Sequence, residues 1–178
     1  MTPEFSHEVK IPHERVAVLI GKDGDIKKRL EEKTQTKLDI DSENGDVLIQ
    51  GDDGLNIFDA KEVVVAIGRG FNPEIALNLV DDNNQLEIID ITTYTGDSKK
   101  KLIRIRARVI GEGGKTREYI EKLTDTNIVI YGKTVGIIGN YEVVGLVRRA
   151  FEGLLSGQRH STVYTWLEKN VKERKQYI

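Results

Sequence analysis

The sequence predicts an α+β protein made of two tandem copies of one β-α-α-β-β-α unit, followed by a C-terminal helix. Three observations predict it: an internal repeat, a Gly-x-x-Gly loop in each copy, and apolar spacing that alternates between helix and strand periods. The chain has 178 residues, of which 38% are hydrophobic and 31% are charged. This composition can bury a core and fits one large domain or two small ones.

The two copies of the repeat are 90 residues apart without a gap, so that Gly111 corresponds to Gly21. Residues 19–40 match residues 109–130 in both glycines of the loop, in the apolar positions of the following helix and in a Thr-x-Thr sequence. Chance could supply two glycines, but hardly all three features together. We therefore infer an internal duplication.

In the first copy, local signals predict each element in turn. Pro12 fits just before a helix, Ile26 and Leu30 share a helical face, and Asn44-Gly45 is a strong hairpin turn. The expected elements are a strand at 8–11, helices at 14–20 and 25–33, strands at 37–41 and 47–50, and a helix at 55–67 that stops at Gly68.

The second copy repeats this order, with one ambiguous segment. Residues 98–110 alternate apolar and basic residues like a strand, yet Leu102, Ile105 and Val109 also have helical spacing. The repeat favours a helix. We expect a strand at 86–91, helices at 98–110 and 115–123, strands at 127–131 and 134–138, and helices at 141–155 and 162–175. The last helix has an apolar stripe that we expect to cover the second copy.

This order of elements is that of a type I K-homology (KH) domain, whose Gly-x-x-Gly loop clamps the backbone of about four nucleotides of RNA. Glycine permits the tight corner between two helices and lets a sugar-phosphate chain approach closely. A single such loop is a weak signal, but two in the same structural context are strong. We divide the chain into a first KH domain (1–70), a helical linker (71–85), a second KH domain (86–156) and the C-terminal helix (157–178).

The two copies differ in charge. Residues 11–41 hold seven basic and seven acidic residues, whereas residues 101–131 hold seven basic and four acidic ones. By strand alternation Asp39 faces the likely RNA cleft, and Val129 takes its place in the second copy. A carboxylate there would repel phosphate, so we expect the second cleft to carry most of the affinity.

The candidate RNA-binding residues are the two loops and the basic residues beside them. In the second copy they are Gly111, Glu112, Gly113, Gly114, Lys115, Arg117, Arg104, Arg108 and Val129; in the first they are Gly21, Lys22, Asp23, Gly24 and Lys28.

Other functional classes find little support. There is no cysteine, and the three histidines have no ligand or triad spacing, so we expect no metal, no cofactor and no catalytic residues. Gly113-Gly114-Lys115-Thr116 resembles the end of a nucleotide-binding P-loop, but Val109 stands where its first glycine belongs. No apolar run is long enough to cross a membrane. We expect a cytoplasmic protein that is not an enzyme.

The chain resembles the archaeal relatives of a eukaryotic small-subunit assembly factor called Dim, or Partner of Nob. The resemblance runs from about residue 9 to residue 169 and is most specific at residues 66–73 and 157–164, which follow the two units. It implies binding to single-stranded rRNA near the 3′ end of the small subunit. It also implies two protein partners, the endonuclease Nob and the alpha subunit of translation initiation factor two.

One alternative stays open. A net charge of −2, with Asp23 and Glu112 inside the two loops, also fits a protein adaptor for ribosome-assembly or translation-initiation factors with little RNA affinity of its own.

Overall fold

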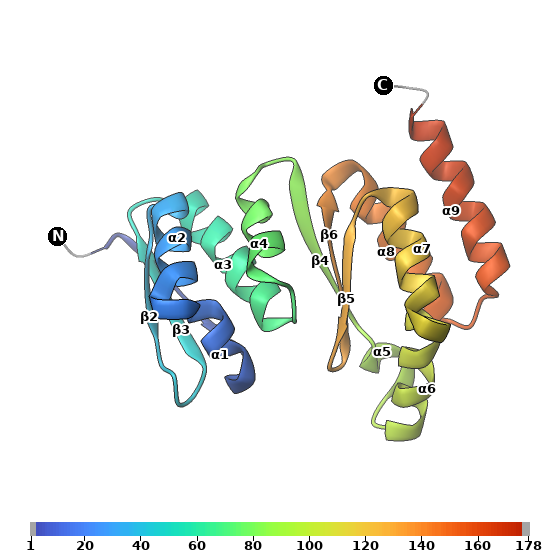
Figure 1. Cartoon of the computed structure of the whole chain (residues 1–178), viewed down its shortest axis with the longest axis horizontal. Helices are drawn as coiled ribbons and strands as arrows, with labels where there is room; N and C mark the ends of the chain where they lie inside the picture. The colour runs from blue at the N-terminus through green and yellow to red at the C-terminus, as the bar shows by residue number, and fades with distance from the viewer. Residues whose placement is uncertain (1–2, 176–178) are drawn as a thin grey trace. The chain divides into compact units, whose positions relative to one another are not determined.

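The computed structural model describes residues 3–175 and separates them into two compact units, one ending at Asn84 and the other beginning at Gln85 (Figure 1). Each unit contains a three-stranded sheet with helices packed on it, and the β1–β3, β2–β3 and β5–β6 pairs are antiparallel. The α+β class and the duplicated order of elements are therefore confirmed.

The first unit contains β1 (Phe5–Lys10), α1 (His13–Ile20), α2 (Asp25–Thr34), β2 (Lys37–Ile40), β3 (Asp46–Gly51) and α3 (Gly54–Gly68). Its strand order is β1-β3-β2, so β1 and β2 are both edge strands. β1 begins earlier than the sequence suggests. Its first four residues are exposed, so they carry no buried alternation that could have marked them as a strand.

The core of the first unit lies between the sheet and its helices. Leu38 of β2 is opposite Ile49 of β3, and both are buried together with Leu30 of α2. The hairpin turn depends on Gly45, because a Cβ at its positive φ would lie 2.3 Å from the carbonyl oxygen of Ile11.

After α3, the chain makes the short helix α4 (Pro73–Ala76) and a 3-10 turn at Leu77–Val80. Phe71 and Ala76 are buried, and α4 packs against α3. Arg29 of α2 makes a two-pronged ion pair with Glu74 of α4, and this hydrogen bonding lowers the pKa of the Glu74 carboxyl. The segment expected as a linker is thus part of the packing of the first unit.

The second unit contains β4 (Asn84–Asp90), α5 (Thr92–Thr95), α6 (Lys99–Ile110), α7 (Lys115–Thr124), β5 (Asn127–Tyr131), β6 (Thr134–Asn140), α8 (Tyr141–Leu155) and α9 (His160–Lys175). The ambiguous segment is a helix, as the repeat indicated, and the Ser98 hydroxyl accepts a hydrogen bond from the Lys101 N–H at its start. The one-turn helix α5 was not predicted.

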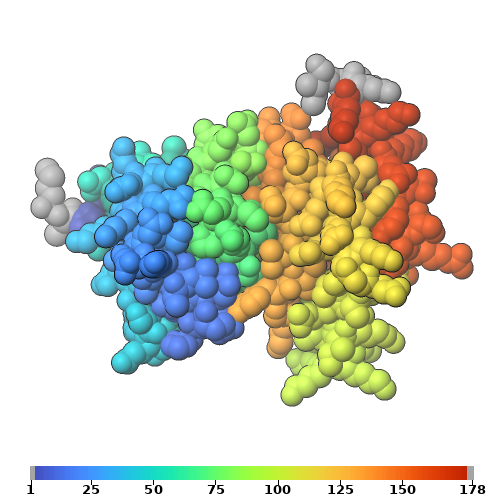
Figure 2. Space-filling model, in the orientation of Figure 1, coloured from blue at the N-terminus to red at the C-terminus, as the bar shows by residue number. Residues whose placement is uncertain are grey.

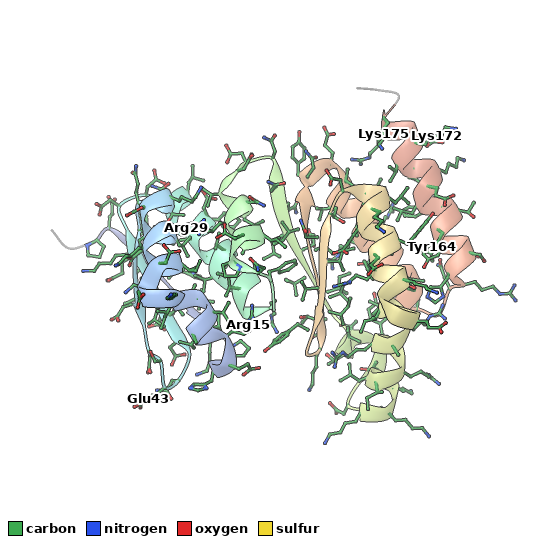
Figure 3. All side chains as sticks on the ribbon, viewed as in Figure 1. Arg15, Arg29, Glu43, Tyr164, Lys172 and Lys175 are labelled. Carbon is green, nitrogen blue, oxygen red and sulfur yellow. The ribbon has the colours of Figure 1, made fainter. Side chains whose placement is uncertain are left out.

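α9 covers α7 and α8 of the second unit. Val163, Leu167 and Val171 are buried in its core. Tyr164 of α9 is labelled in Figure 3, and its ring lies 4.4 Å from that of Tyr119 on α7, centroid to centroid. Tyr119 also donates a hydrogen bond to Glu168, and this contact raises the pKa of Tyr119 to about 12. Among residues 3–175, no helix is long and apolar enough to span a bilayer.

Candidate nucleic-acid interface

The two Gly-x-x-Gly loops have the same backbone shape. Each first glycine ends a helix with a positive φ, 74° at Gly21 and 78° at Gly111, and its N–H donates to a carbonyl of the last helical turn. A single 3-10 turn follows, and the next helix starts immediately after the last glycine of the loop. Each loop therefore joins its two helices through a tight corner, with only the 3-10 turn between them.

The first glycine of each loop is required by a close approach. A Cβ on Gly111 would lie 2.3 Å from the hydroxyl oxygen of Thr116, and one on Gly21 would lie 2.5 Å from Cγ1 of Ile26. No side chain fits at these distances, so the start of the second helix would have to move.

The third loop position shows how the copies differ without a change in shape. Gly113 has φ 58°, and Asp23 has φ 53° at the corresponding place. Aspartate is one of the few residues that tolerate this left-handed conformation. The first loop therefore keeps the fold of the second, with its one carboxylate at this position, whereas the second loop has its one carboxylate at Glu112.

A conserved contact within the repeat joins each loop helix to the neighbouring edge strand. The Glu31 carboxylate accepts a hydrogen bond from the Leu38 N–H at 2.7 Å, and Glu121 accepts one from Ile128 at 2.8 Å. Backbone groups alternate between inward and outward bonding along an antiparallel strand. Ile40 and Ile130, two residues further on, therefore also turn their N–H and C=O groups outward at the open edge, where a nucleotide base could pair with them.

Two half-buried arginines flank the second loop in the sequence. The Nε groups of Arg106 and Arg117 are buried and have no hydrogen-bond partner within the described chain, and Arg117 lies 4.0 Å from the Glu121 carboxylate. The same carboxylate group bonds the edge of β5, so Arg117 lies on the side of α7 that faces this edge. We call this surface, formed by Arg106, the loop 111–114, Arg117 and the outer edge of β5, the second loop face.

Arg106 was missed among the site residues because the segment 98–110 alternates like a strand and gives no clue to its orientation. Comparing the copies would have found it, since the corresponding residue, Val16, is buried in the first unit. An arginine in place of a core valine indicates a demand other than packing.

Arg108 and Arg104 lie on another side of α6. Arg108 donates from Nε to the Leu154 carbonyl at 3.0 Å and from its terminal nitrogen to the Gln158 carbonyl. Arg104 and Arg108 line a hollow beside the C-terminal end of α8. Residues two apart on a helix are about 200° apart, so Arg106 points away from this side. Arg108 stabilises the end of α8, and neither it nor Arg104 belongs to the second loop face.

Asp39 and Val129 lie on the side of the sheet away from the helices. Their neighbours Leu38 and Ile128 are buried under the helices, so strand alternation places Asp39 and Val129 on the opposite, helix-free faces of their sheets. Asp39 shares a row with Leu48 and Glu8, beside a hollow of about 330 Å³ whose lining includes four carboxylates. Half-buried Ile40 and Ile130 occupy the helix side instead.

The other predicted residues are accessible. Lys22 and Asp23 of the first loop, Glu112 and Gly113 of the second, and Lys28 and Lys115 on the following helices are exposed. The lysines at 99–101 are also exposed, and side chains of this segment project from the surface in Figure 2, where α6 is yellow-green. Within residues 3–175, no group of acidic residues and histidines could hold a metal ion.

Known proteins match both units. A model of the KH domain matches residues 6–66, and one described as a eukaryotic type KH-domain (KH-domain type I), the second of its protein, matches residues 85–172. A KH domain-containing protein of Methanocaldococcus jannaschii is 48% identical over 165 residues, which cover 90% of this chain and 72% of that protein.

A solved structure extends the match. The complex of a/eIF2alpha, aDim2p and rRNA from Pyrococcus horikoshii contains a chain with a TM-score of 0.87 and 43% identity, with 95% of both chains covered. The chain belongs to the Dim2/Pno1 family of KH-domain ribosome-assembly proteins. The RNA-binding protein pno1 of Drosophila pseudoobscura is 34% identical over 113 residues, and the match covers 61% of this chain and 46% of that longer protein.

Dim2/Pno1 proteins bind RNA in ribosome biogenesis and are not enzymes. Membership of this family confirms the expectation of an RNA-binding protein of ribosome biogenesis and the expectation that it is not an enzyme. The two sequences at 66–73 and 157–164, which follow the two units, have a structural role in this chain. The carbonyls of Ile67 and Phe71 in the first sequence accept the hydrogen bonds of Arg15, and the carbonyl of Gln158 in the second, with that of Leu154 just before it, accepts those of Arg108.

Proposed function

We propose that this protein holds single-stranded small-subunit rRNA near its 3′ end during ribosome biogenesis, with the second loop face as the main site. The observation that carries the proposal is the charge around the second loop, because residues 101–131 hold seven basic and four acidic residues and Lys115, directly after the loop, is exposed. The guanidinium groups of Arg106 and Arg117 add to this charge on either side of the loop in the sequence. Guanidinium groups bind phosphate oxygens and stack on bases, and both interactions favour a single strand.

The first unit offers a weaker site of the same shape. The position of Arg106 is taken by buried Val16, and residues 11–41 around its loop hold seven basic and seven acidic residues. Affinity for a phosphate chain depends on the cations that can replace condensed counterions. We assign the first unit an auxiliary role in binding RNA.

The test is fluorescence anisotropy with a short RNA that copies the 3′ end of small-subunit rRNA. Gly113→Asp/Gly114→Asp gives the second loop two aspartates at its last positions, and Gly24→Asp gives the first loop the same pair. We expect the second-loop variant to lose about tenfold or more in affinity and to have a shallower salt dependence, and the first-loop variant to lose much less. A larger loss from Gly24→Asp would overturn the assignment.

Two protein partners complete the proposal. The aDim2p neighbour forms a complex with a/eIF2alpha and rRNA, which supports the alpha subunit of initiation factor two as a partner here. The family resemblance alone suggests the Nob endonuclease. If RNA affinity proves negligible in the anisotropy experiment, the adaptor function becomes the better account, since Asp23 and Glu112 are both exposed in the loops.

A further inference from the structure

The helix α6 carries a positive charge that works against its own stability. Six of its twelve residues are lysine or arginine, and none is acidic. Cations in the first turn of a helix oppose the helix macrodipole, and like charges four residues apart repel each other. Both effects apply to α6, because residues 99–101 are lysines in its first turn and Lys100, Arg104 and Arg108 are spaced four apart. A bound polyanion would relieve both repulsions.

Much of this charge lies on one side of the helix. At 3.6 residues per turn, Lys100, Lys101 and Arg104 fall within about 100° of one another, on a side away from buried Val109. All three are exposed. We call these three residues the α6 outer stripe. Arg108 extends the same side, but its guanidinium is bound to the end of α8.

Acidic residues around α6 do not pair with the stripe. Asp97 and Glu112 flank the helix in the sequence, outside its two ends. Glu152 of α8 is bound to Arg148. Within residues 3–175, no side chain of the α6 outer stripe makes an ion pair or a hydrogen bond.

A hollow opens beside the stripe at Arg104. Its volume is about 500 Å³, and its lining includes Arg104, Ile105, Leu154, Leu155 and Ser156. Leu154 and Leu155 are buried and give it an apolar floor, whereas Arg104 and Ser156 are exposed at its rim. Bases that are splayed out of a single strand stack on side chains and on arginine planes. The hollow therefore favours RNA over an acidic protein segment, which would use the charge alone.

The first unit folds without this arrangement. Its helix α1 begins at His13, the counterpart of Ile103, so the turn Lys99–Leu102 corresponds to the strand end and loop at 9–12. Exposed Glu14 takes the place of Arg104. A carboxylate at the equivalent position shows that the fold requires no cation there.

We propose that the α6 outer stripe and this hollow form a second RNA contact of the second unit, with phosphates on the stripe and one base in the hollow. The inference rests on the proposed function, because the RNA is the same strand that the second loop face holds. Lys100 lies about 16 Å along the helix axis from Gly111, and Arg104 lies about 200° around the helix from Arg106. A strand therefore reaches the stripe only if it extends well beyond the roughly four nucleotides that a Gly-x-x-Gly loop clamps.

The experiment compares two RNAs that copy the 3′ end of small-subunit rRNA, by fluorescence anisotropy on the full chain. One strand has about four nucleotides and the other about 15. Lys100→Gln/Arg104→Gln, the stripe variant, should bind the short strand like wild type and lose about tenfold or more in affinity for the long one. Its salt dependence with the long strand should fall by about 1.4 in slope, because each phosphate contact of a single strand contributes about 0.7.

The matched control is Lys172→Gln/Lys175→Gln, which removes the same charge from exposed lysines at the end of α9, labelled in Figure 3, far from α6. It should bind both strands like wild type. Ser156→Leu places a larger side chain at the rim of the hollow without a change of charge, and should weaken binding of the long strand alone. The stripe variant should be at least as stable as wild type in thermal unfolding, because it removes a repulsion within α6.

Wild-type affinity of the stripe variant for the long strand would overturn the inference, and so would an equal loss in the α9 control. Wild-type affinity in Ser156→Leu would overturn the place of a base in the hollow. A stripe variant that is less stable than wild type would show that the charge serves the fold instead. Failure of the proposed function has a different signature, in which Gly113→Asp/Gly114→Asp binds the short strand as well as wild type does.

Discussion

Arg15 and Arg108 make equivalent hydrogen bonds in the two units from different positions of the repeat. Arg15 donates to the carbonyls of Ile67 at 2.7 Å and Phe71 at 2.8 Å, and Arg108 donates to those of Leu154 and Gln158. These acceptors lie at matching positions around the C-terminal ends of α3 and α8. Arg15, labelled in Figure 3, corresponds to Ile105 in the ungapped repeat, so the donor has moved by about one helical turn.

Arg108→Ala should therefore reduce stability rather than RNA affinity. It leaves the carbonyls at the end of α8 without a charged donor, which typically costs about 1.5–3 kcal/mol. Urea unfolding of the second unit should show this loss, while anisotropy should show nearly wild-type RNA binding. Arg106→Ala should give the reverse pattern, with weaker RNA binding and little loss of stability. Equal effects of the two variants on RNA affinity would contradict the second loop face as defined here.

The sequence predicted the fold well because the duplication supplied each element twice. The segment 98–110 could not be assigned from its own spacing, but its alignment with the helix before the first loop was sufficient. The errors concern elements without a repeated or periodic signal. β1 was placed too late because its first residues are exposed, and α5 is a single turn with no pattern of its own.

The candidate site was only partly predictable, because side-chain direction depends on packing. Charge alone cannot tell Arg106 from Arg108, although Arg108 bonds the end of α8 and Arg106 lies about 200° around the helix from it. Strand alternation correctly placed Asp39 and Leu38 on different faces of the sheet. It could not indicate which side of the sheet the helices cover, and this decides which residues lie near the loop.

Gly111→Ala and Gly113→Ala should differ sharply in effect. Gly111 has φ 78° and ψ 167°, a region that is nearly restricted to glycine, and an added Cβ would also meet Thr116. We expect a loss of at least about 1–3 kcal/mol in the stability of the second unit. Gly113 has φ 58° with open space around its Cα, so alanine there should cost only about 1 kcal/mol. Thermal unfolding of both variants tests this, and similar losses would show that the close approach to Thr116 is not decisive.

Alkaline pH should destabilise the second unit through Tyr119. Its hydrogen bond to Glu168, with partial burial and that carboxylate's charge, raises the pKa of Tyr119 from 10.0 to about 12. Between these values the unfolded chain loses the phenolic proton while the folded chain keeps it, so stability falls as pH rises from 10.0 to about 12. Below the lower value this contribution is fully present.

Urea unfolding at several alkaline pH values, compared between wild type and two variants, measures this effect. Tyr119→Phe removes the titrating group, so the fall in stability over this pH range should be shallower than in wild type. Glu168→Gln removes the carboxylate, and the pKa of Tyr119, followed by tyrosinate absorbance, should move back toward its usual value. Because α9 is joined to α7 by this contact and by the Tyr119–Tyr164 ring pair, an unchanged pH profile in both variants would mean that apolar packing alone holds α9 in place.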